Sequence, residues 1–170
     1  MFNIRNGVFE TNSSSTHVIA LNGKSYARVE NKFYRVTKDN KVLVSLGEYS
    51  WGPDYLEGSD NKLSYLMTMI CMNLIQEGCE TFSEVYESDY FKEIETFIKE
   101  NTTYFGIVID RSGDNTDRLD TGDFYIDHQS LYGSYKQFLD DYDLTLYDYL
   151  FNSKYYIIID NDNHFWLERR

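Results

Sequence analysis

From residue 2 to residue 46, hydrophobic and polar residues alternate in short runs with a period of two. This alternation is typical of β-strands that bury one face, and the turn sequence Asn22–Gly23 favours a tight hairpin. The predicted strands span residues 2–9, 17–21, 26–30, 33–37 and 41–46. Because tight turns join most of these runs, we expect an antiparallel meander.

A period of three to four residues follows and predicts helices. The clearest helix begins with Ser59 or Asp60 as its N-cap and ends at Gly78. Its single apolar stripe consists of Leu63, Leu66, Met67, Ile70, Cys71, Leu74 and Ile75. Further helices are expected over residues 83–100, 131–140 and 144–152.

Strands return between and after these helices. Residues 104–109 form a nearly continuous apolar run, which predicts a central strand covered on both faces. Residues 124–126 indicate a short strand, and residues 155–159 and 164–167 indicate a terminal hairpin. The order predicts one α+β domain, residues 1–170, in which a mostly antiparallel sheet (N-terminal meander plus C-terminal hairpin) packs against two longer and two short helices.

The net charge of −12 is unevenly distributed along the 170 residues. Residues 1–79 contain eight acidic and eight basic residues, so residues 80–170 carry the whole excess. Phosphates would be repelled by that half, whereas a basic protein surface would be attracted to it. The alternative is that the acidity only keeps a small domain in solution. The candidate acidic surface consists of Asp110, Asp114, Asp117, Asp120, Asp123, Asp127, Asp140, Asp141 and Asp143.

Several classes of protein are disfavoured by the sequence. No apolar run approaches the roughly 20 residues of a membrane span, and the N-terminus lacks the order of a secretory signal. Cys71 and Cys79 form no disulfide framework or zinc motif, and Cys71 is expected to be a buried thiol. The segment from Asp110 begins like a calcium loop, but Asn115 and Thr121 replace its essential Gly and Glu. We therefore expect a solvated loop there, no metal and no cofactor.

The densest group of polar side chains lies around the first predicted loop. The candidate binding residues of this polar loop are Arg5, Glu10, Asn12, Ser13, Ser14, Ser15 and His17. Three interpretations are open. The hydroxyls can bond to nearby backbone and hold a tight connection. With Arg5 they can cradle a phosphate, or a serine can act as nucleophile with His17 as base and Glu10 as orienting group.

The segment Gly7–His17, with the sequence GVFETNSSSTH, resembles the opening of a family of uncharacterised bacteriophage and prophage proteins. The resemblance extends to the segments 47–52 and 62–66. It implies an origin in an infected or lysogenic bacterial cell, and it implies no particular chemistry because the family has no settled activity.

The charge and the implied origin together predict a non-catalytic interaction protein of the host bacterial cytoplasm. Its partner would be the basic surface of a bacterial nuclease or another nucleic-acid-binding effector, and it would act as an anti-defence inhibitor of the anti-CRISPR kind. Direct binding to nucleic acid or to a membrane is not expected, and a homo-oligomer is left open. The alternative is an enzyme or ligand-binding protein that acts on a nucleotide or phosphorylated metabolite through the polar loop. A virion or assembly component is a third hypothesis.

Overall fold

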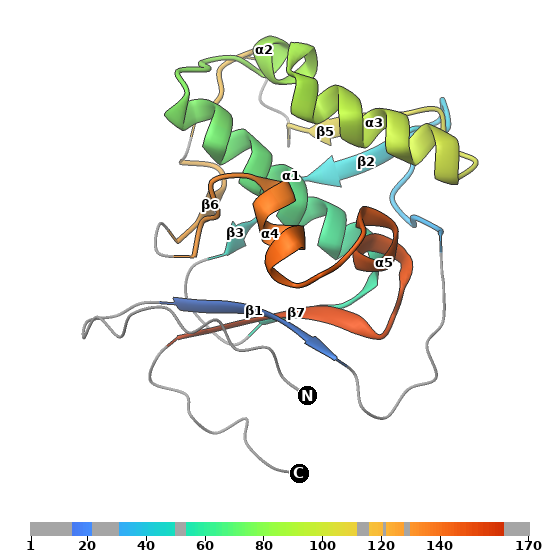
Figure 1. The fold of residues 1–170 in the computed structure, drawn as a ribbon. Coiled ribbons are helices and arrows are strands. Elements are labelled where there is room, and N and C mark those ends of the chain that lie inside the picture. The colour runs from blue at the N-terminus through green and yellow to red at the C-terminus, as the bar shows by residue number, and fades with distance from the viewer. Residues whose placement is uncertain are drawn as a thin grey trace.

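Helix α1 (Gly58–Gln76) runs through the middle of the structure and is buried on nearly every side (Figure 1). The predicted stripe of this helix is buried, with Ile75 half-buried at its end, but Tyr65, Thr68 and Met69 on its other faces are buried as completely. A helix in this position needs packing partners all round. The prediction of a single apolar stripe was therefore too narrow.

The structure is a computed structural model, and it describes residues 15–21, 31–49, 54–111, 116–120, 122–127 and 130–161. The remaining helices are α2 (Phe82–Glu87), α3 (Asp89–Asn101), α4 (Tyr135–Asp141) and α5 (Leu146–Phe151). The strands are β1 (Ser15–Leu21), β2 (Val42–Ser45), β3 (Glu48–Tyr49), β4 (Asp54–Leu56), β5 (Ile107–Asp110), β6 (Tyr125–Ile126) and β7 (Tyr155–Asn161). The predicted α+β class is confirmed.

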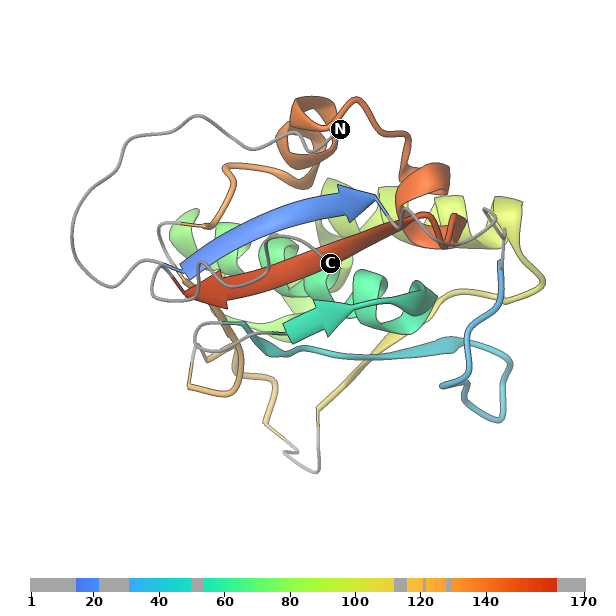
Figure 2. The same ribbon diagram turned by 90° about the horizontal axis from the view of Figure 1, so that it is seen from below.

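The largest sheet is antiparallel and has the strand order β1-β7-β4. Figure 2 shows the three strands side by side, on the side of α1 that faces away from α2. Ile157 of β7 pairs with Ile19 on one side and with Leu56 on the other, and all three side chains are buried. This row of side chains joins the sheet to the core.

The other strand pairs do not follow the predicted meander. β2 pairs in parallel with β5, and β3 pairs in parallel with β6, so both partners come from distant parts of the sequence. The predicted turn at 38–40 is confirmed, with Asn40 at φ 56°, but the predicted strand 33–37 is reduced to one bridge between Val36 and Val42. Alternation shows which face of a strand is buried, but it does not identify the neighbouring strand.

The terminal hairpin also requires a correction. β1 and β4 occupy both edges of β7 around Ile157–Ile159, so β7 is the middle strand of its sheet. The predicted partner, residues 164–167, lies outside the described residues, as does the predicted strand 26–30.

The second predicted helix, 83–100, is divided into α2 and α3 at Ser88. This residue has an extended backbone (ψ 149°), and its Oγ accepts a hydrogen bond from the N–H of Phe91 at 3.2 Å. Ser88 therefore ends α2 and caps the N-terminus of α3. The two short helices occur close to their predicted positions as α4 and α5.

The predicted central strand 104–109 is shorter and less covered than expected. β5 begins only at Ile107, and within the described part of the chain it pairs with β2 alone. Phe105 is 67% exposed. Its exposure shows that a continuous apolar run does not by itself place every residue in a sheet interior.

The described elements share one hydrophobic core around α1. Cys71 lies in this core as a free thiol, as predicted, and burial raises its pKa to about 12. Among the described helices, none combines the length and the apolar character needed to cross a membrane.

Candidate interaction surface

The polar loop falls largely outside the described residues. Arg5, Glu10, Asn12, Ser13 and Ser14 all belong to residues 1–14, which are not described. The backbones of Ser15 and His17 lie in β1, opposite Asn161 and Ile159 of β7. Ser15 and Thr16 are therefore strand residues, not loop residues as predicted. The three interpretations of the loop remain predictions.

The predicted acidic surface divides into residues with different neighbours. Three of its aspartates form ion pairs with arginines of the same chain, and Asp114 lies outside the described residues. The pairs are Asp110–Arg35 at 2.7 Å, Asp117–Arg111 at 3.2 Å and Asp120–Arg118 at 3.5 Å. We call these three residues the arginine-paired aspartates. Their charge is locally compensated, which weakens their attraction for an external cation.

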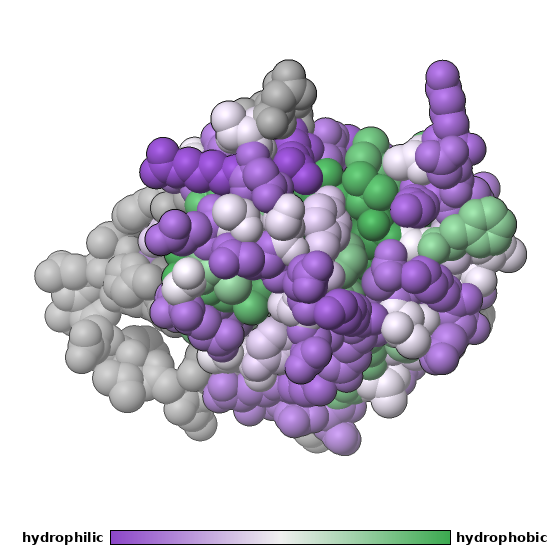
Figure 3. Space-filling model, turned by 90° about the horizontal axis from the view of Figure 1, so that it is seen from above, coloured by the Kyte–Doolittle hydropathy of each residue, from purple (hydrophilic) through white to green (hydrophobic). Residues whose placement is uncertain are grey.

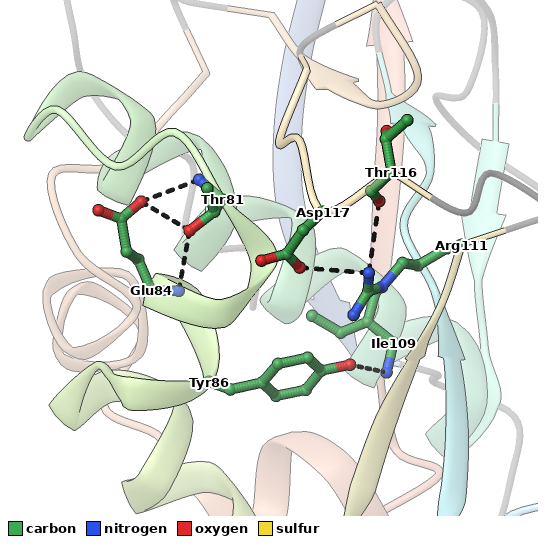
Figure 4. Close-up of polar contacts among 7 residues, drawn as sticks. All are labelled: Thr81, Glu84, Tyr86, Ile109, Arg111, Thr116 and Asp117. Atoms are coloured by element: carbon green, nitrogen blue, oxygen red, sulfur yellow. Dashed lines mark hydrogen bonds and ion pairs between the residues drawn. The ribbon is translucent and has the colours of Figure 1, made fainter.

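The side chain of Arg111 contacts several neighbouring groups, and Figure 4 shows two of them, Thr116 and Asp117. Its guanidinium lies 5.1 Å from the ring centre of Phe82, at the start of α2. Besides its ion pair with Asp117, it donates a hydrogen bond to the carbonyl oxygen of Thr116 at 3.4 Å. The side chain thus connects the end of β5 with α2 and with the segment that begins at Thr116.

Backbone hydrogen bonds hold the same segment against the start of α2. The N–H of Phe82 donates to the carbonyl oxygen of Asp117 at 2.9 Å, and the N–H of Leu119 donates to that of Glu80 at 2.8 Å. Leu119 is buried. Residues 116–120 are therefore anchored to the fold at Leu119, although Thr116 and Arg118 are exposed, as expected for a solvated loop.

Helix α2 begins with a capping box, also drawn in Figure 4. Thr81 Oγ accepts a hydrogen bond from the N–H of Glu84. The Glu84 carboxylate accepts hydrogen bonds from the N–H of Glu80, from the hydroxyl of Thr81 and from the N–H of Thr81. These hydrogen bonds lower the pKa of Glu84, that from Glu80 most strongly. The carboxylate of Glu84 thus stabilises the N-terminus of α2.

Tyr86 on α2 forms a hydrogen bond with the backbone of β5. Its hydroxyl accepts a hydrogen bond from the N–H of Ile109 at 3.1 Å (Figure 4). A side chain therefore satisfies a strand donor that a further strand would otherwise satisfy.

Two more predicted residues lie near β6. Asp123 is exposed and Asp127 is partly buried. The N–H of Asp127 donates to the carbonyl oxygen of Tyr49 at 3.2 Å, which continues the pairing of β3 with β6. Asp127 thus contributes its backbone to the fold.

The last three predicted aspartates lie together at the C-terminal end of α4, and we call them the acidic end: Asp140, Asp141 and Asp143. All three are exposed. Asp143 has φ 53°, and its N–H donates to the carbonyl oxygen of Asp140, while the N–H of Leu144 donates to that of Leu139. This is a Schellman motif, in which glycine is the usual residue at the position of Asp143.

The charge of the acidic end is unusual for its position. The last carbonyl groups of a helix carry partial negative charge, so this position normally attracts Lys, Arg or His. The last turn of α4 contains no basic residue. Within the described part of the chain, no lysine or arginine forms an ion pair with Asp140, Asp141 or Asp143. The acidic end therefore combines three carboxylates with a helix terminus of the same sign.

Sequence reasoning missed a buried polar contact between α1 and α5. Ser59 Oγ donates to the carbonyl oxygen of Leu150 at 3.0 Å, and Lys62 Nζ donates to that of Asn152 at 3.1 Å. In return, the hydroxyl of Tyr149 donates to the carbonyl oxygen of Lys62 at 2.9 Å. Ser59 and Lys62 thus satisfy carbonyl groups at the C-terminal end of α5, so the role of this contact is structural.

The position of Lys62 carries an electrostatic cost. The residue is only 1% exposed, and burial lowers its pKa to about 8, although the nearby Glu57 carboxylate partly opposes this. The sequence indicated that Lys62 could be buried. It lies four residues before Leu66, which belongs to the apolar stripe, and hence on the same side of α1.

Among the residues that the structure describes, no group of three His, Cys, Asp or Glu side chains could hold a metal ion. Comparisons with models of protein families, with curated proteins and with solved structures found no match for this chain. The function of the chain is therefore inferred from its own surfaces.

Proposed function

We propose that this chain is a non-catalytic interaction protein of bacteriophage origin that captures a basic surface of a bacterial protein through its acidic end. The partner would be a nuclease or another nucleic-acid-handling effector in the host cytoplasm, and binding would inhibit it. The single observation that supports this proposal is the uncompensated charge of Asp140, Asp141 and Asp143 at the terminus of α4.

A basic partner could supply cations to the acidic end. A lysine or arginine placed beside the acidic end would meet three carboxylates and the negative end of a helix dipole. No described residue of the chain itself provides such a cation there. The arginine-paired aspartates are less suited to this role, because a partner would have to compete with an arginine already in place. The proposed binding surface is thus smaller than the one expected from the sequence.

The test uses two variants with the same change in net charge. In the first, Asp140, Asp141 and Asp143 are replaced by Asn. In the second, three exposed glutamates without a side-chain ion pair in the described structure are replaced by Gln: Glu77, Glu87 and Glu100. Tagged wild-type chain captures partners from bacterial lysate at low salt, and a protein released at high salt is purified and its affinity for each variant is measured.

We expect the Asn variant to bind the purified partner at least about tenfold more weakly and the Gln variant to bind about as well as the wild type. The wild type should also inhibit the nucleic-acid-directed activity of that partner, and the Asn variant should not. Equal losses in the two variants would mean that only total charge matters, and the proposal would be wrong.

A further inference from the structure

A second exposed surface lies where the segment before β2 meets the segment after α3. The side-chain amide of Asn40 donates to the carbonyl oxygen of Thr103 at 2.7 Å, and the N–H of Phe105 donates to that of Asn40 at 2.9 Å. The hydroxyl of Tyr104 accepts from the N–H of Phe33 at 3.1 Å and donates to its carbonyl oxygen at 2.8 Å. These hydrogen bonds hold the two segments together.

Aromatic side chains are exposed on both segments. Tyr34 is 72% exposed and Phe105 is 67% exposed, the highest values among the large hydrophobic residues of the described chain. Lys32 Nζ lies 5.3 Å from the ring centre of Tyr34. Figure 3, which views the molecule from the side of α2 and α3, shows apolar side chains exposed in a few places on a mostly hydrophilic surface. Exposed phenylalanine has no polar group to hydrate, so a stacking partner would stabilise it.

The same segments contain more basic than acidic residues of their own, although Asp60 of α1 lies against them and accepts hydrogen bonds from the N–H groups of Tyr34 and Arg35. Residues 31–41 and 99–105 contain five lysines and arginines against two acidic residues, Asp39 and Glu100. Two of the five cations are already occupied, because Arg35 pairs with Asp110 and Lys99 pairs with Glu95. The other three are Lys32, Lys38 and Lys41, which form no ion pair with the described residues.

We define the basic corner as Lys32, Tyr34, Lys38, Lys41 and Phe105, and we propose that it binds single-stranded nucleic acid. Bases would stack on the two exposed rings, and the three lysines would contact phosphates. An acidic polypeptide would also attract the lysines, but it would leave the exposure of Phe105 without a role. Stacking on aromatic rings together with phosphate contacts is the combination that single-stranded nucleic acids offer.

This inference goes beyond the proposed function, since it concerns a different surface and a different class of partner. It also departs from the expectation that the chain binds no nucleic acid directly. That expectation came from the total charge of the second half, whereas the basic corner draws on local charge. Figure 1 places the segments before β2 and after α3 together, away from the C-terminal end of α4. The net charge of −12 will make binding weak and strongly dependent on salt.

The experiment measures fluorescence anisotropy of a labelled oligothymidylate of about 12 nucleotides, titrated with the whole chain at about 50 mM salt. Three variants are compared with the wild type. Phe105→Leu keeps an apolar side chain but removes the ring. Lys38→Gln combined with Lys41→Gln removes two cations, and the Asn variant of the acidic end serves as the control.

We expect Phe105→Leu to weaken binding at least about fivefold, which corresponds to the loss of one stacked base. The lysine variant should weaken binding and reduce the slope of log K against log salt by about one. The control variant should bind at least as tightly as the wild type, and thermal melting should show that all variants are folded. The proposal is overturned if the wild type shows no saturable binding, or if it binds polyglutamate as well as oligothymidylate and Phe105→Leu has no effect.

Discussion

The arginine-paired aspartates and the acidic end contain the same kind of residue in opposite surroundings. Asp110, Asp117 and Asp120 each lie within 3.5 Å of an arginine that the fold brings from elsewhere in the chain or from a nearby position. The acidic end has no such partner within the described residues, and it lies at the helix terminus where negative charge is least favourable.

The difference shows that a count of charges does not define a binding surface. A carboxylate beside an arginine contributes mainly to local structure, and its field is cancelled within a few ångströms. An uncompensated carboxylate projects its field to about a Debye length, roughly 8–10 Å, where a partner can meet it. Lys62 is a third case, because its charged group is buried and shielded from water. Changes to these charges should therefore affect stability most at Lys62 and least at the acidic end.

The largest effect is expected for Lys62→Met, as a change in how stability depends on pH. The folded pKa of about 8 lies below the unfolded value, so between these pKa values the unfolded chain binds more protons. Stability of the wild type should therefore rise with pH in this window, by about 2 kcal/mol more than that of the variant between pH ~7.5 and ~9.5. Urea unfolding at a series of pH values measures the difference.

The upper limit of this window is set by other groups. Burial raises the pKa of Tyr65 and of Tyr149, so above pH ~10 the unfolded chain loses protons that the folded chain keeps, and stability falls. Both proteins share this fall, so it cancels in the comparison. Identical pH profiles for wild type and variant would show that Lys62 does not titrate in the folded chain as described.

Replacing Arg111 by Met should cost about 1–2 kcal/mol in the free energy of unfolding. The change removes the contact with the ring of Phe82 and the ion pair with Asp117. The matched control is Arg118→Met, because Arg118 is 77% exposed and its pair with Asp120 should contribute less than about 0.5 kcal/mol. Chemical denaturation of both variants measures the contrast, and equal losses would remove the distinction between an anchoring and a surface arginine.

Replacing Asp143 by Gly should raise the free energy of unfolding by about 0.5–1 kcal/mol. Glycine adopts the left-handed conformation without steric cost, and the change also removes a negative charge from the end of α4. Asn40 has a similar φ, but its side chain donates to the carbonyl oxygen of Thr103. Asn40→Gly should therefore give no gain. Melting temperatures of the two variants decide the matter, and a loss at Asp143 would indicate that this carboxylate stabilises the chain.

The smallest effect is expected for a single neutralisation at the acidic end. Asp140→Asn should raise the free energy of unfolding by about 0.3–0.5 kcal/mol at low salt, because a carboxylate is removed from a helix C-terminus. The mirror control is Asp89→Asn in the first turn of α3, which should lower it by a similar amount. Both differences should vanish at about 1 M salt. Changes of the same sign in the two variants would contradict the helix-dipole argument.

The sequence predicted the positions of α1, α4 and α5 closely because their periodicity and the glycine after α1 are local signals. The predicted N-cap of α1 was wrong, because the cap position is occupied by Glu57, and Ser59 lies inside the helix and bonds to α5. The sequence failed at Ser88, where an extended residue in the middle of a helical pattern separates α2 from α3. It also failed for the faces of α1. Lys62, Thr68 and Asn73 are buried, although polar residues are normally assigned to solvent. Lys62 donates to Asn152 and Thr68 accepts from the N–H of Gly47, and no local pattern connects either segment to α1.

The candidate surfaces show the same division. All nine aspartates of the predicted acidic surface were visible in the sequence, and Arg111 and Arg118 lie near three of them, but the sequence did not show which arginine pairs with which aspartate. Arg35 is 75 positions away from Asp110, and only the parallel pairing of β2 with β5 brings them within 2.7 Å. The exposure of Phe105 was likewise hidden within an apolar run that predicted burial.

By itself the sequence determined which residues form most of the helices, which class of fold results and how unevenly the charge is distributed along the chain. These properties depend on neighbours a few positions apart, where helix and strand periodicities act. Only the tertiary structure decided which strands pair, which charges are compensated and which aromatic rings face water. Those outcomes depend on contacts between distant segments, and many alternative contacts are compatible with the same local pattern.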